Sequence, residues 1–479
     1  MSKNQNSQSS PANQNSRSNP SVYLPEAFQV RMKQMLGAEY DAFLGSYEKS
    51  RYQGLRVNEL KISREDFLNL RDNFRDMEPV PWCSNGFYYP EEERPGRHVW
   101  HEAGLYYIQE PSAMSAAELL QARPGEKVLD LCAAPGGKSS QLASAMQGEG
   151  LLVVNEIHPA RARILSQNME RMGVRNVLVL NEDPEHLARH FAGFFDRILC
   201  DAPCSGEGMF RKDEEAVSQW SPEHVTMCAD RQFSILLEAE RMLRPGGRLV
   251  YSTCTFAEEE NEGVISRFQE ACPWMEADLS VDCPHFTPGK LPGTWRLWPH
   301  HLHGEGHGVA VLKKAGQESG LSGEGYAVGK DLFAEEKTIP WEDQRKLREF
   351  HTWGKETLSR PLKGNYLFFG QQLYRVPDFC PPLKGLKVLR PGLQMGEQKG
   401  KLFKPAHALA MALRPDEVKQ TIHGSHEEII RYLRGEMLDC EKEKGWVLVC
   451  VDGVSTGWGK AGNQVVKNHY PKGLRINWQ

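Results

Sequence analysis

The chain has 479 residues, 40% of them hydrophobic, which is too long for one ordinary hydrophobic core and predicts a multidomain globular protein. No run of about 18 apolar residues and no secretory signal pattern occurs, so we expect a cytoplasmic protein without a membrane partner. The net charge of −5 does not by itself indicate a nucleic-acid-binding protein, and the 11 cysteines form no CxxC pair, which favours reduced thiols over disulfides.

The N-terminal region has two parts. The first twenty residues are rich in Ser, Asn and Gln and contain almost no apolar side chain, so 1–20 is predicted to be a disordered tail. From Leu24 to about Tyr47, apolar residues recur every three or four positions. This spacing predicts one or two amphipathic helices broken near Gly37, at the start of a small N-terminal domain over 21–95.

Residues 96–315 alternate short apolar runs with helix-like segments. The runs KVLDL, LLVVNE, VLVLN, DRILCDAP and GGRLVYST are typical of buried strands. Helices are predicted from about Gly137, over Pro159 to Met172 and near Pro222 to Leu243. This alternation predicts an α/β fold with a doubly wound, Rossmann-like parallel sheet that binds ligands at the carboxyl ends of its strands.

After Lys314 the composition changes. The Gly/Ser-rich stretch AGQESGLSGEGYAVGKD predicts a linker, and the strand candidates GNYLFFG, QLYRV and GWVLVCV follow it. We divide this region into a linker with a small intermediate domain over 316–390 and a β-rich domain over 391–479.

The C-terminal region is also basic. Residues 361–479 carry 18 Lys and Arg against 11 Asp and Glu, a net charge of +7, which leaves −12 on the rest of a chain whose net charge is −5. This excess suits a polyanionic partner, although an ordinary solvated surface stays an alternative. For Trp446 and Trp458, which lie near Lys460 and Lys467, both stacking on RNA and packing in a core are open.

The segment VLDLCAAPGGKSSQLA places Asp130 at a strand end, followed by small residues and a helix. Small side chains let the backbone approach a ligand, and a helix start offers unpaired N–H groups. A phosphate-binding P-loop would need glycine where Cys132 stands, and the GxGxxG spacing of a dinucleotide loop is absent. S-Adenosylmethionine remains, and the predicted cofactor-binding residues are Cys132, Ala133, Ala134, Pro135, Gly136, Gly137 and Lys138.

Two more acids follow the next strands. Glu156 ends LLVVNE, where such folds place the carboxylate that holds the ribose hydroxyls, and Asp183 follows VLVLN, where it is predicted to meet the adenine edge. A single acid beyond a strand is more often a helix N-cap. The ordered series of Asp130, Glu156 and Asp183 is what favours a cofactor site.

Two cysteines stand just past strand ends: Cys204 in DRILCDAPCSGEGMF and Cys254 in YSTCTFAEEENE. A lone cysteine is usually a small buried hydrophobic side chain, which is the expectation for Cys132, Cys200 and Cys228. Cys204 and Cys254 instead lie between small or polar neighbours on the ligand-binding edge of the predicted sheet.

These segments resemble the bacterial RNA cytosine-5 methyltransferases and, within them, the RsmF group that acts on 16S rRNA. LDLCAAPGGKSSQLA, DRILCDAPCSGEGMFRK and LVYSTCTFAEEENE match the family's motifs in order and spacing. RVNELK is similar to its N-terminal domain, RLWPHHLHGEGHGVAVLKK to the end of its catalytic domain, and GLQMGEQKGKLFKPAHALA, more weakly, to its PUA-like RNA-binding extension.

The resemblance implies methyl transfer from S-adenosylmethionine to carbon 5 of a cytosine in structured RNA, with 16S rRNA or the small ribosomal subunit as partner. A tRNA substrate is the alternative within the family. A non-catalytic RNA-binding assembly factor and a small-molecule methyltransferase are the alternatives from other classes. A monomer is expected.

The chemistry gives two thiols a purpose. Carbon 5 of cytosine is too electron-poor to attack a methyl group, but a thiolate that adds to carbon 6 makes it nucleophilic. Spacing does not settle which thiol adds, because related DNA enzymes use the Pro-Cys position of Cys204. The resemblance assigns Cys254 as nucleophile and Cys204 as the group that assists proton removal and RNA release. Asp201 is predicted to donate a proton to ring nitrogen 3 and to contact the cofactor.

Two further sets of residues were considered. His300, His301, His303 and His307 match no standard metal-ligand spacing, so no metal is predicted. Arg211 and Lys212 are candidate phosphate contacts, with a solvated loop as the equal alternative.

Overall fold

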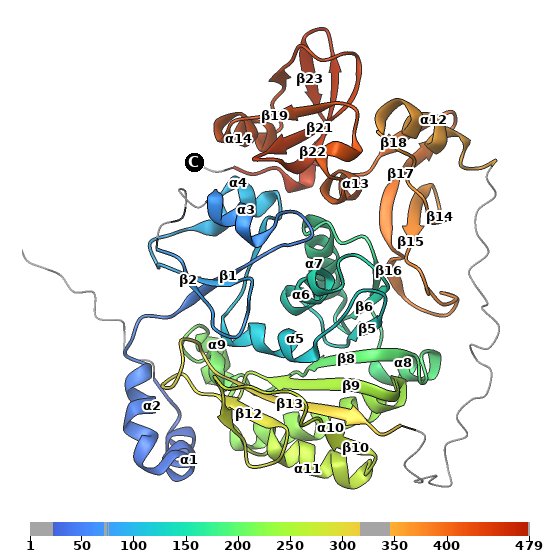
Figure 1. Ribbon diagram of the computed structural model, residues 1–479. Helices are drawn as coiled ribbons and strands as arrows, with labels where there is room; N and C mark the ends of the chain where they lie inside the picture. The colour runs from blue at the N-terminus through green and yellow to red at the C-terminus, as the bar shows by residue number, and fades with distance from the viewer. Residues whose placement is uncertain (1–22, 71–73, 75, 317–344, 478–479) are drawn as a thin grey trace, which may run out of the picture.

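A computed structural model describes residues 23–70, 74, 76–316 and 345–477. It contains a large central sheet, a small sheet formed by the N-terminal region, and two small sheets formed by the C-terminal region (Figure 1). The predicted tail over 1–20 and most of the predicted linker lie outside the described residues. Within the described ranges, no helix combines the length and the hydropathy that a membrane span requires.

The first helices confirm the predicted break. They are α1 (Glu26–Leu36), η1 (Gly37–Glu39) and α2 (Tyr40–Ser46). Gly37 has φ +53°, a left-handed conformation that favours glycine and ends α1. The apolar side chains Phe28 and Phe43 are fully buried. The ring centroid of Phe43 lies 5.3 Å from that of Phe256, which belongs to the central unit, the part of the chain built around the large central sheet. The two helices therefore cover the side of the central unit.

A four-stranded antiparallel sheet of order β2-β3-β1-β4 follows. Its elements are β1 (Gln53–Val57), α3 (Arg64–Asn69), β2 (Glu78–Pro79), β3 (Gly86–Tyr89), η3 (Pro95–Arg97), α4 (Val99–Glu102) and β4 (Tyr106–Ile108). The predicted domain limit at residue 95 falls inside this unit, because β4 completes its sheet. Buried Trp100 donates a hydrogen bond to Asp452 Oδ2 at 2.6 Å, which joins this unit to the C-terminal domain.

The central sheet has ten strands in the described part of the chain, in the order β11-β12-β13-β9-β8-β5-β6-β7-β16 with β10 paired to β13. The strands are β5 (Lys127–Asp130), β6 (Leu151–Asn155), β7 (Val177–Leu180), β8 (Phe195–Asp201), β9 (Leu243–Thr253), β10 (Met275–Ala277), β11 (Thr287–Pro288), β12 (Thr294–Leu297), β13 (His307–Lys314) and β16 (Val388–Arg390). The strands from β9 to β7 are parallel. The chain order reverses between β5 and β8, and ligands bind at the carboxyl ends beside such a reversal.

Helices cover both faces of this sheet, as the doubly wound prediction requires (Figure 1). On one face lie α5 (Ser115–Leu120), α6 (Gly137–Ala145) and α7 (Pro159–Arg171), and on the other lie α8 (Pro184–His190), α10 (Pro222–Met242) and α11 (Glu262–Ala271). Short helices η4 (Ser112–Met114), η5 (Glu207–Met209) and α9 (Glu214–Gln219) connect them. The predicted α/β fold, its five strand runs and its three helices are confirmed.

The antiparallel edges were not predicted. β13 pairs with β9, and β16 reaches back from the C-terminal region to pair with β7. Neither strand belongs to a strand–helix–strand unit, so the alternation that predicted the parallel strands does not extend to them.

The C-terminal region forms two small units. The first contains α12 (Arg348–Thr357), β14 (Asn365–Phe369), β15 (Gln372–Val376), β17 (Leu393–Lys399), β18 (Leu402–Pro405), α13 (His407–Ala412) and η6 (Pro415–Glu417). The second contains β19 (Thr421–His423), α14 (His426–Arg434), β20 (Leu438–Asp439), β21 (Gly445–Val451), β22 (Val454–Gly462), β23 (Val465–Asn468) and η7 (Lys472–Leu474). The sheet β14-β15-β17-β18 spans the predicted limit at residue 390.

The two tryptophans of the C-terminal domain have different surroundings. Trp458 is 1% exposed, and its Nε1 donates to Ala406 O at 2.9 Å, so packing in the core is the alternative that holds for Trp458. Trp446 is partly exposed, with Lys460 Nζ 5.5 Å from its ring centroid. Only Trp446 keeps the stacking interpretation.

Candidate active site

The two predicted thiols meet at the carboxyl edge of the central sheet. Cys204 follows β8 and Cys254 follows β9, which are parallel neighbours, so turns fifty residues apart in sequence lie side by side. The two Sγ atoms are 3.2 Å apart, and both side chains are partly buried. A single substrate atom can therefore be reached from either sulfur.

Glu260 ties the two cysteine turns together. Its carboxylate is fully buried and accepts hydrogen bonds from Ser205 N at 3.0 Å and from Ser205 Oγ, beside Cys204. Gln232 Nε2 donates to the same carboxylate at 2.7 Å. Burial raises the pKa of Glu260. Sequence analysis did not single out Glu260, although the acids of AEEENE after Cys254 were the available signal.

Asn261, the next residue of that motif, fixes the Cys254 turn. Thr253 Oγ1 donates to Asn261 Oδ1 at 2.8 Å, and Asn261 Nδ2 donates to Thr255 O at 3.1 Å. Gly308 on β13 is required here, since a Cβ at that position would stand 2.0 Å from Asn261 Oδ1. The backbone on both sides of the nucleophile candidate is therefore held by one amide.

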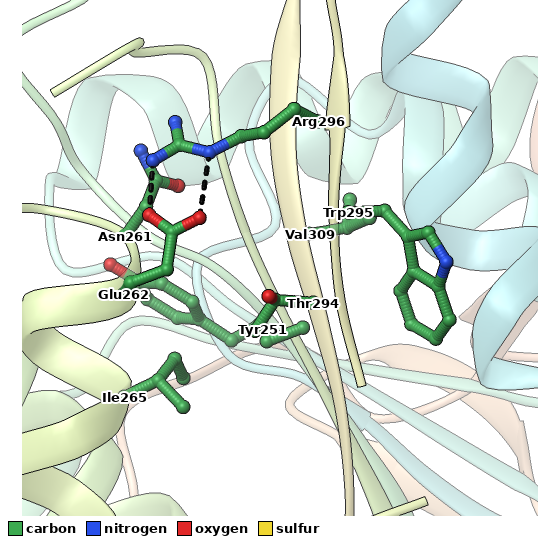
Figure 2. A pocket seen from close by; sticks show the side chains of 9 residues that line it. Tyr251, Asn261, Glu262, Ile265, Thr294, Trp295, Arg296 and Val309 are labelled. Atoms are coloured by element: carbon green, nitrogen blue, oxygen red, sulfur yellow. Dashed lines mark hydrogen bonds and ion pairs between the residues drawn. The ribbon is translucent and has the colours of Figure 1, made fainter. Parts of the chain in front are cut away.

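Glu262 and Arg296 form a buried ion pair beneath this turn (Figure 2). Arg296 Nε donates to Glu262 Oε1 at 3.0 Å, Nη2 donates to Oε2, and Nη1 donates to Phe256 O at 3.2 Å. The adjoining cavity of about 10 Å³ has room for no more than a water molecule. This part of the sheet is packed support for the site.

Glu262→Gln should destabilise the protein by about 3–5 kcal/mol, because it leaves the Arg296 guanidinium buried without its counter-charge. Burial alone would raise the pKa of Glu262, but Arg296 lowers it, so the pair stabilises the fold at neutral pH and loses this contribution as the pH falls through the lowered pKa. Urea unfolding followed by tryptophan fluorescence measures the change. The exposed pair Arg189–Glu185 is the control, and Glu185→Gln should cost less than about 1 kcal/mol. Equal losses would contradict the assignment.

Asp201, at the end of β8, is surrounded by cationic and hydrogen-bonding groups. Lys138 Nζ lies 2.8 Å from Oδ2, Ser252 Oγ donates to Oδ1 at 2.7 Å, and His307 Nε2 lies 3.8 Å from Oδ1. Burial would raise the pKa of Asp201, but Lys138 and His307 outweigh it and hold the pKa well below its usual range. Asp201 is therefore a carboxylate at neutral pH. To donate a proton to nitrogen 3 of cytosine, it must first receive that proton from another group.

The charges around the sulfurs distinguish the two cysteines. The neighbouring thiol of Cys254, together with burial, raises the pKa of Cys204, so Cys204 keeps its hydrogen at neutral pH. Burial would lower the pKa of Lys138, but Asp201 and Cys254 raise it, which keeps Lys138 cationic beside Cys254. The Cys204 sulfur lies 3.2 Å from that of Cys254, so the hydrogen that Cys204 keeps can be donated to Cys254.

The loop after β5 leads into α6 and contains most of the predicted cofactor-binding residues. Gly136 has φ +114°, and a Cβ there would stand 3.1 Å from Met169 Cε, so glycine is required where the loop enters α6. Arg56 of the N-terminal sheet is buried and donates to Gly137 O at 3.0 Å and to Ser140 Oγ at 2.6 Å. The RVNELK segment thereby docks the N-terminal unit onto the start of α6.

Two acids at adjacent strand ends fit S-adenosylmethionine. Asp130 Oδ2 accepts from Ser139 Oγ at 2.6 Å, whereas buried Oδ1 has no hydrogen-bond partner among the described residues. Burial raises the pKa of Asp130 to about 7. The side chain of Glu156 is 3% exposed and accepts from His158 N at 2.9 Å. A buried acceptor without a donor, beside a second buried acid, suits the amino and hydroxyl groups of this cofactor.

Asp183 lies one strand farther from the thiols. Its side chain is exposed and accepts from His186 N at 2.9 Å, which caps α8. This is the helix-cap alternative, and the contact of Asp183 with adenine stays a prediction. The preceding Glu182 is the buried acid at this strand end, and it accepts from Lys387 N at 2.6 Å.

Arg211 is a structural residue. Its Nε donates to Glu305 Oε2 at 2.7 Å and its Nη1 donates to Ser46 O at 2.5 Å, with both side chains of the ion pair buried. Neither alternative that the sequence left open for Arg211, a phosphate contact or a solvated loop, fits this buried ion pair. Lys212 is exposed and stays a candidate.

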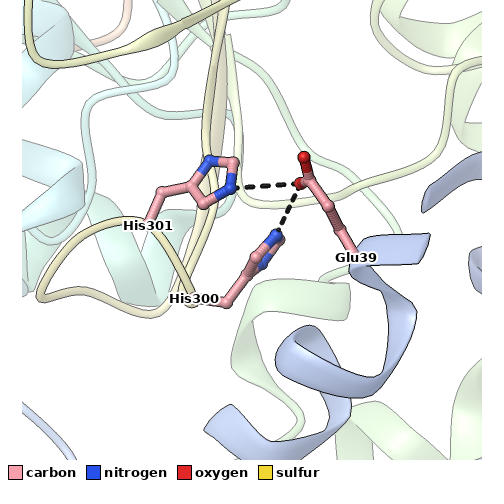
Figure 3. Close-up of side chains that lie close together, drawn as sticks. All are labelled: Glu39, His300 and His301. Carbon is pink, nitrogen blue, oxygen red and sulfur yellow. Dashed lines mark hydrogen bonds and ion pairs between the residues drawn. The ribbon is translucent and has the colours of Figure 1, made fainter. Parts of the chain in front are cut away.

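Two histidines of HHLHGEGH meet an acid that sequence analysis did not connect with them. His300 Nε2 and His301 Nε2 each lie 3.1 Å from Glu39 Oε2 on η1 (Figure 3). His300 also packs edge-on against Phe43. We interpret the cluster as an attachment of the N-terminal helices to the loop after β12, and the absence of a metal stays a prediction.

Comparison with known proteins gives matches along the chain. Family models described as 16S rRNA methyltransferase RsmB/F, the N-terminal domain of 16S rRNA methyltransferase RsmF, the RsmF rRNA methyltransferase first C-terminal domain and the methyltransferase RsmF PUA domain match 117–313, 24–111, 352–413 and 419–476. The ribosomal RNA small subunit methyltransferases F of Vibrio campbellii and Enterobacter sp. are 33% and 31% identical, over 95% of this chain and 98% and 96% of theirs.

Solved structures agree on the central unit. A methyltransferase homolog protein from Pyrococcus horikoshii is 31% identical, with a TM-score of 0.54 over 61% of this chain and 96% of that one. NSun6 from Pyrococcus horikoshii is 21% identical, with a TM-score of 0.53 over 60% of this chain and 98% of that one. The second likeness concerns the fold alone.

Proposed function

The chain belongs to the RsmF family of 16S rRNA methyltransferases, and on that premise we propose that it methylates carbon 5 of a cytosine in 16S rRNA through a covalent bond to Cys254. The observation that carries the proposal is the pair of sulfurs 3.2 Å apart beside Lys138 and Asp201. Carbon 6 must bond to one sulfur while a second group removes a proton from carbon 5, and this arrangement supplies both.

The residues that would hold S-adenosylmethionine are Asp130, Glu156 and the loop 132–138. When bound, it supplies an electrophilic methyl group. The loop after β5 and the thiols after β8 and β9 share one edge of the sheet, so the methyl group would lie on the same edge as the thiols. A stacked base exposes neither face of its ring, so the cytosine must be unpaired or rotated out of its helix.

We assign the roles as the family resemblance implies, and the contacts described above support them. Cys254 adds to carbon 6 as the thiolate that this step requires and makes carbon 5 nucleophilic. Asp201 faces nitrogen 3 and the amino group of the ring. Once Cys254 is bound to carbon 6, the neighbouring thiol that raises the pKa of Cys204 most is gone, so Cys204 can release its hydrogen to solvent. After carbon 5 is methylated, the Cys204 sulfur takes the proton from carbon 5, which lets the bond between carbon 6 and Cys254 break. Asn261 and Glu260 hold both turns in position during these steps.

The test is methylation of small subunits and, in a separate assay, of tRNA, both from cells that lack the gene. Purified protein should restore 5-methylcytosine in 16S rRNA, mapped by bisulfite sequencing, with S-adenosylmethionine as the methyl donor. Restoration in tRNA instead of 16S rRNA would establish the alternative substrate. No methylation of either RNA, with RNA binding retained, would contradict the proposal and favour an assembly factor without catalysis.

Other parts of the proposal concern the state of the protein. We propose that the protein is a monomer. Its ribosomal RNA substrate supports a cytoplasmic location. The proposed steps require only thiols, carboxylates and a methyl donor, so we propose no resident metal. The C-terminal units, with their net positive charge, would hold RNA around the target. Binding should therefore weaken steeply as salt is raised.

A further inference from the structure

His307 is a buried histidine that faces the catalytic carboxylate. It begins β13, is 5% exposed, and its Nδ1 lies 2.9 Å from Gly306 O. Its Nε2 has no hydrogen-bond partner in the described part of the chain and lies 3.8 Å from Asp201 Oδ1, longer than a hydrogen bond. Sequence analysis considered His307 only as a metal ligand, and the proposed steps above give it no role.

The surroundings of the ring define which hydrogens it carries. A carbonyl oxygen only accepts, so the contact with Gly306 O places a hydrogen on Nδ1. A lone pair on Nε2 would then face the Asp201 carboxylate, whereas a hydrogen there would point toward it. The doubly protonated ring therefore matches both neighbours.

Other charged groups face the same ring. The Glu110 carboxylate comes from the segment before η4, and although burial would raise its pKa, Lys212 and His307 lower it. Lys138 reaches Asp201 from α6, with its Nζ on Oδ2, whereas His307 lies nearest Oδ1. Glu110 and Asp201 are thus the two carboxylates that interact with the His307 ring, and Asp201 lies between Lys138 and His307.

We propose that His307 supplies, through Asp201, the proton that nitrogen 3 of the cytosine takes up as Cys254 adds to carbon 6. The inference rests on the proposed function, and it makes His307 a positioning and proton-supplying residue that acts through Asp201. His307 would thus be the group that gives Asp201 the proton it lacks as a carboxylate at neutral pH.

The step balances in atoms and charge. The Cys254 thiolate forms the sulfur–carbon bond, the electron pair of the double bond between carbons 5 and 6 shifts into the ring, and nitrogen 3 takes a proton from Asp201. Asp201 takes a proton from His307 Nε2 through one bridging water, because 3.8 Å is too long for direct transfer, and this leaves a neutral imidazole. A thiolate and an imidazolium thus become a thioether and an imidazole, and the ring stays neutral. When Cys254 leaves, the proton on nitrogen 3 returns by the same route.

The test compares His307→Gln with wild-type protein and with His303→Gln. Gln retains an N–H group but cannot transfer a proton, and His303 is an exposed residue of the same motif that stacks on Tyr52. The readout is the single-turnover rate at which protein becomes covalently attached to 16S rRNA transcribed with 5-fluorocytidine, measured across pH. Release of Cys254 requires the hydrogen on carbon 5 to be lost as a proton. Fluorine in its place cannot be lost as a cation, so the adduct accumulates.

Adduct formation by His307→Gln should be slower than wild type by about 10²-fold or more, with an unchanged Kd for RNA. Wild type needs a thiolate and a protonated imidazole, so its rate should rise and then fall as the pH increases, and His307→Gln should lose the fall at high pH. A His307→Gln protein with the wild-type rate, or with the fall at high pH retained, would overturn the inference alone. Absence of any adduct with wild-type protein would instead overturn the proposed function with it.

Discussion

Cys254→Ala is expected to reduce methyl incorporation into 16S rRNA by at least about 10³-fold, because no other group can make the bond to carbon 6. Cys204 is close enough to substitute geometrically, with its sulfur 3.2 Å from that of Cys254. Cys254→Ala removes the largest cause of the raised Cys204 pKa, but burial and the Glu260 carboxylate still raise it, and a thiol that keeps its hydrogen is a poor nucleophile. Transfer of labelled methyl groups from S-adenosylmethionine measures the effect.

The control for Cys254→Ala is Cys440→Ala, which removes a partly buried thiol from the C-terminal domain and should keep full activity. Circular dichroism and S-adenosylmethionine binding establish that the Cys254 variant is folded. Substantial methylation by Cys254→Ala, with loss of activity in Cys204→Ala, would exchange the roles of the two residues. That result would match the Pro-Cys arrangement of the related DNA enzymes.

The parallel part of the fold could be predicted because its signal is local. Each of the strands β5 to β9 is a short apolar run followed by a helix or a turn, and connections of this kind have one favoured handedness. The strand ends then follow from the same pattern, which is why Asp130, Asp201, Cys204 and Cys254 could be placed on one edge before any coordinates.

Other features depend on contacts between distant segments. Glu39 and His300 are 261 residues apart, and nothing in either segment indicates the other. Trp458 lies on β22, and its indole Nε1 donates to Ala406 O, which is 52 residues away in the sequence. β16 is three residues long, and its pairing with β7 comes from the route of the chain after the linker.

The supporting acids of the active site show the same limit in another form. Glu260, Asn261 and Glu262 stand in one row of the sequence, where they resemble a solvated acidic turn. In the folded chain they are buried and point to three different partners: the Cys204 turn, the Cys254 turn and Arg296. A charged residue in the sequence thus predicts an exposed side chain only where the fold offers it no buried partner. The partners of these three residues come from other segments of the chain.

Cys204→Ala should convert the enzyme into one that stays attached to its substrate. Addition by Cys254 and methylation of carbon 5 do not require Cys204, but loss of the proton from carbon 5 does, and the bond to Cys254 breaks only after that loss. Multiple turnover should therefore fall by at least about 10²-fold, while a band of protein joined to RNA appears on a denaturing gel.

The double variant Cys204→Ala, Cys254→Ala separates this trapped complex from incidental crosslinking, because it retains neither thiol and should give no such band. The trapped species should also carry the labelled methyl group, since it forms after methylation. Normal turnover by Cys204→Ala without a band would mean that solvent or another base removes the proton. The 3.2 Å between the sulfurs would then serve only to favour the thiolate of Cys254, through the hydrogen that Cys204 donates.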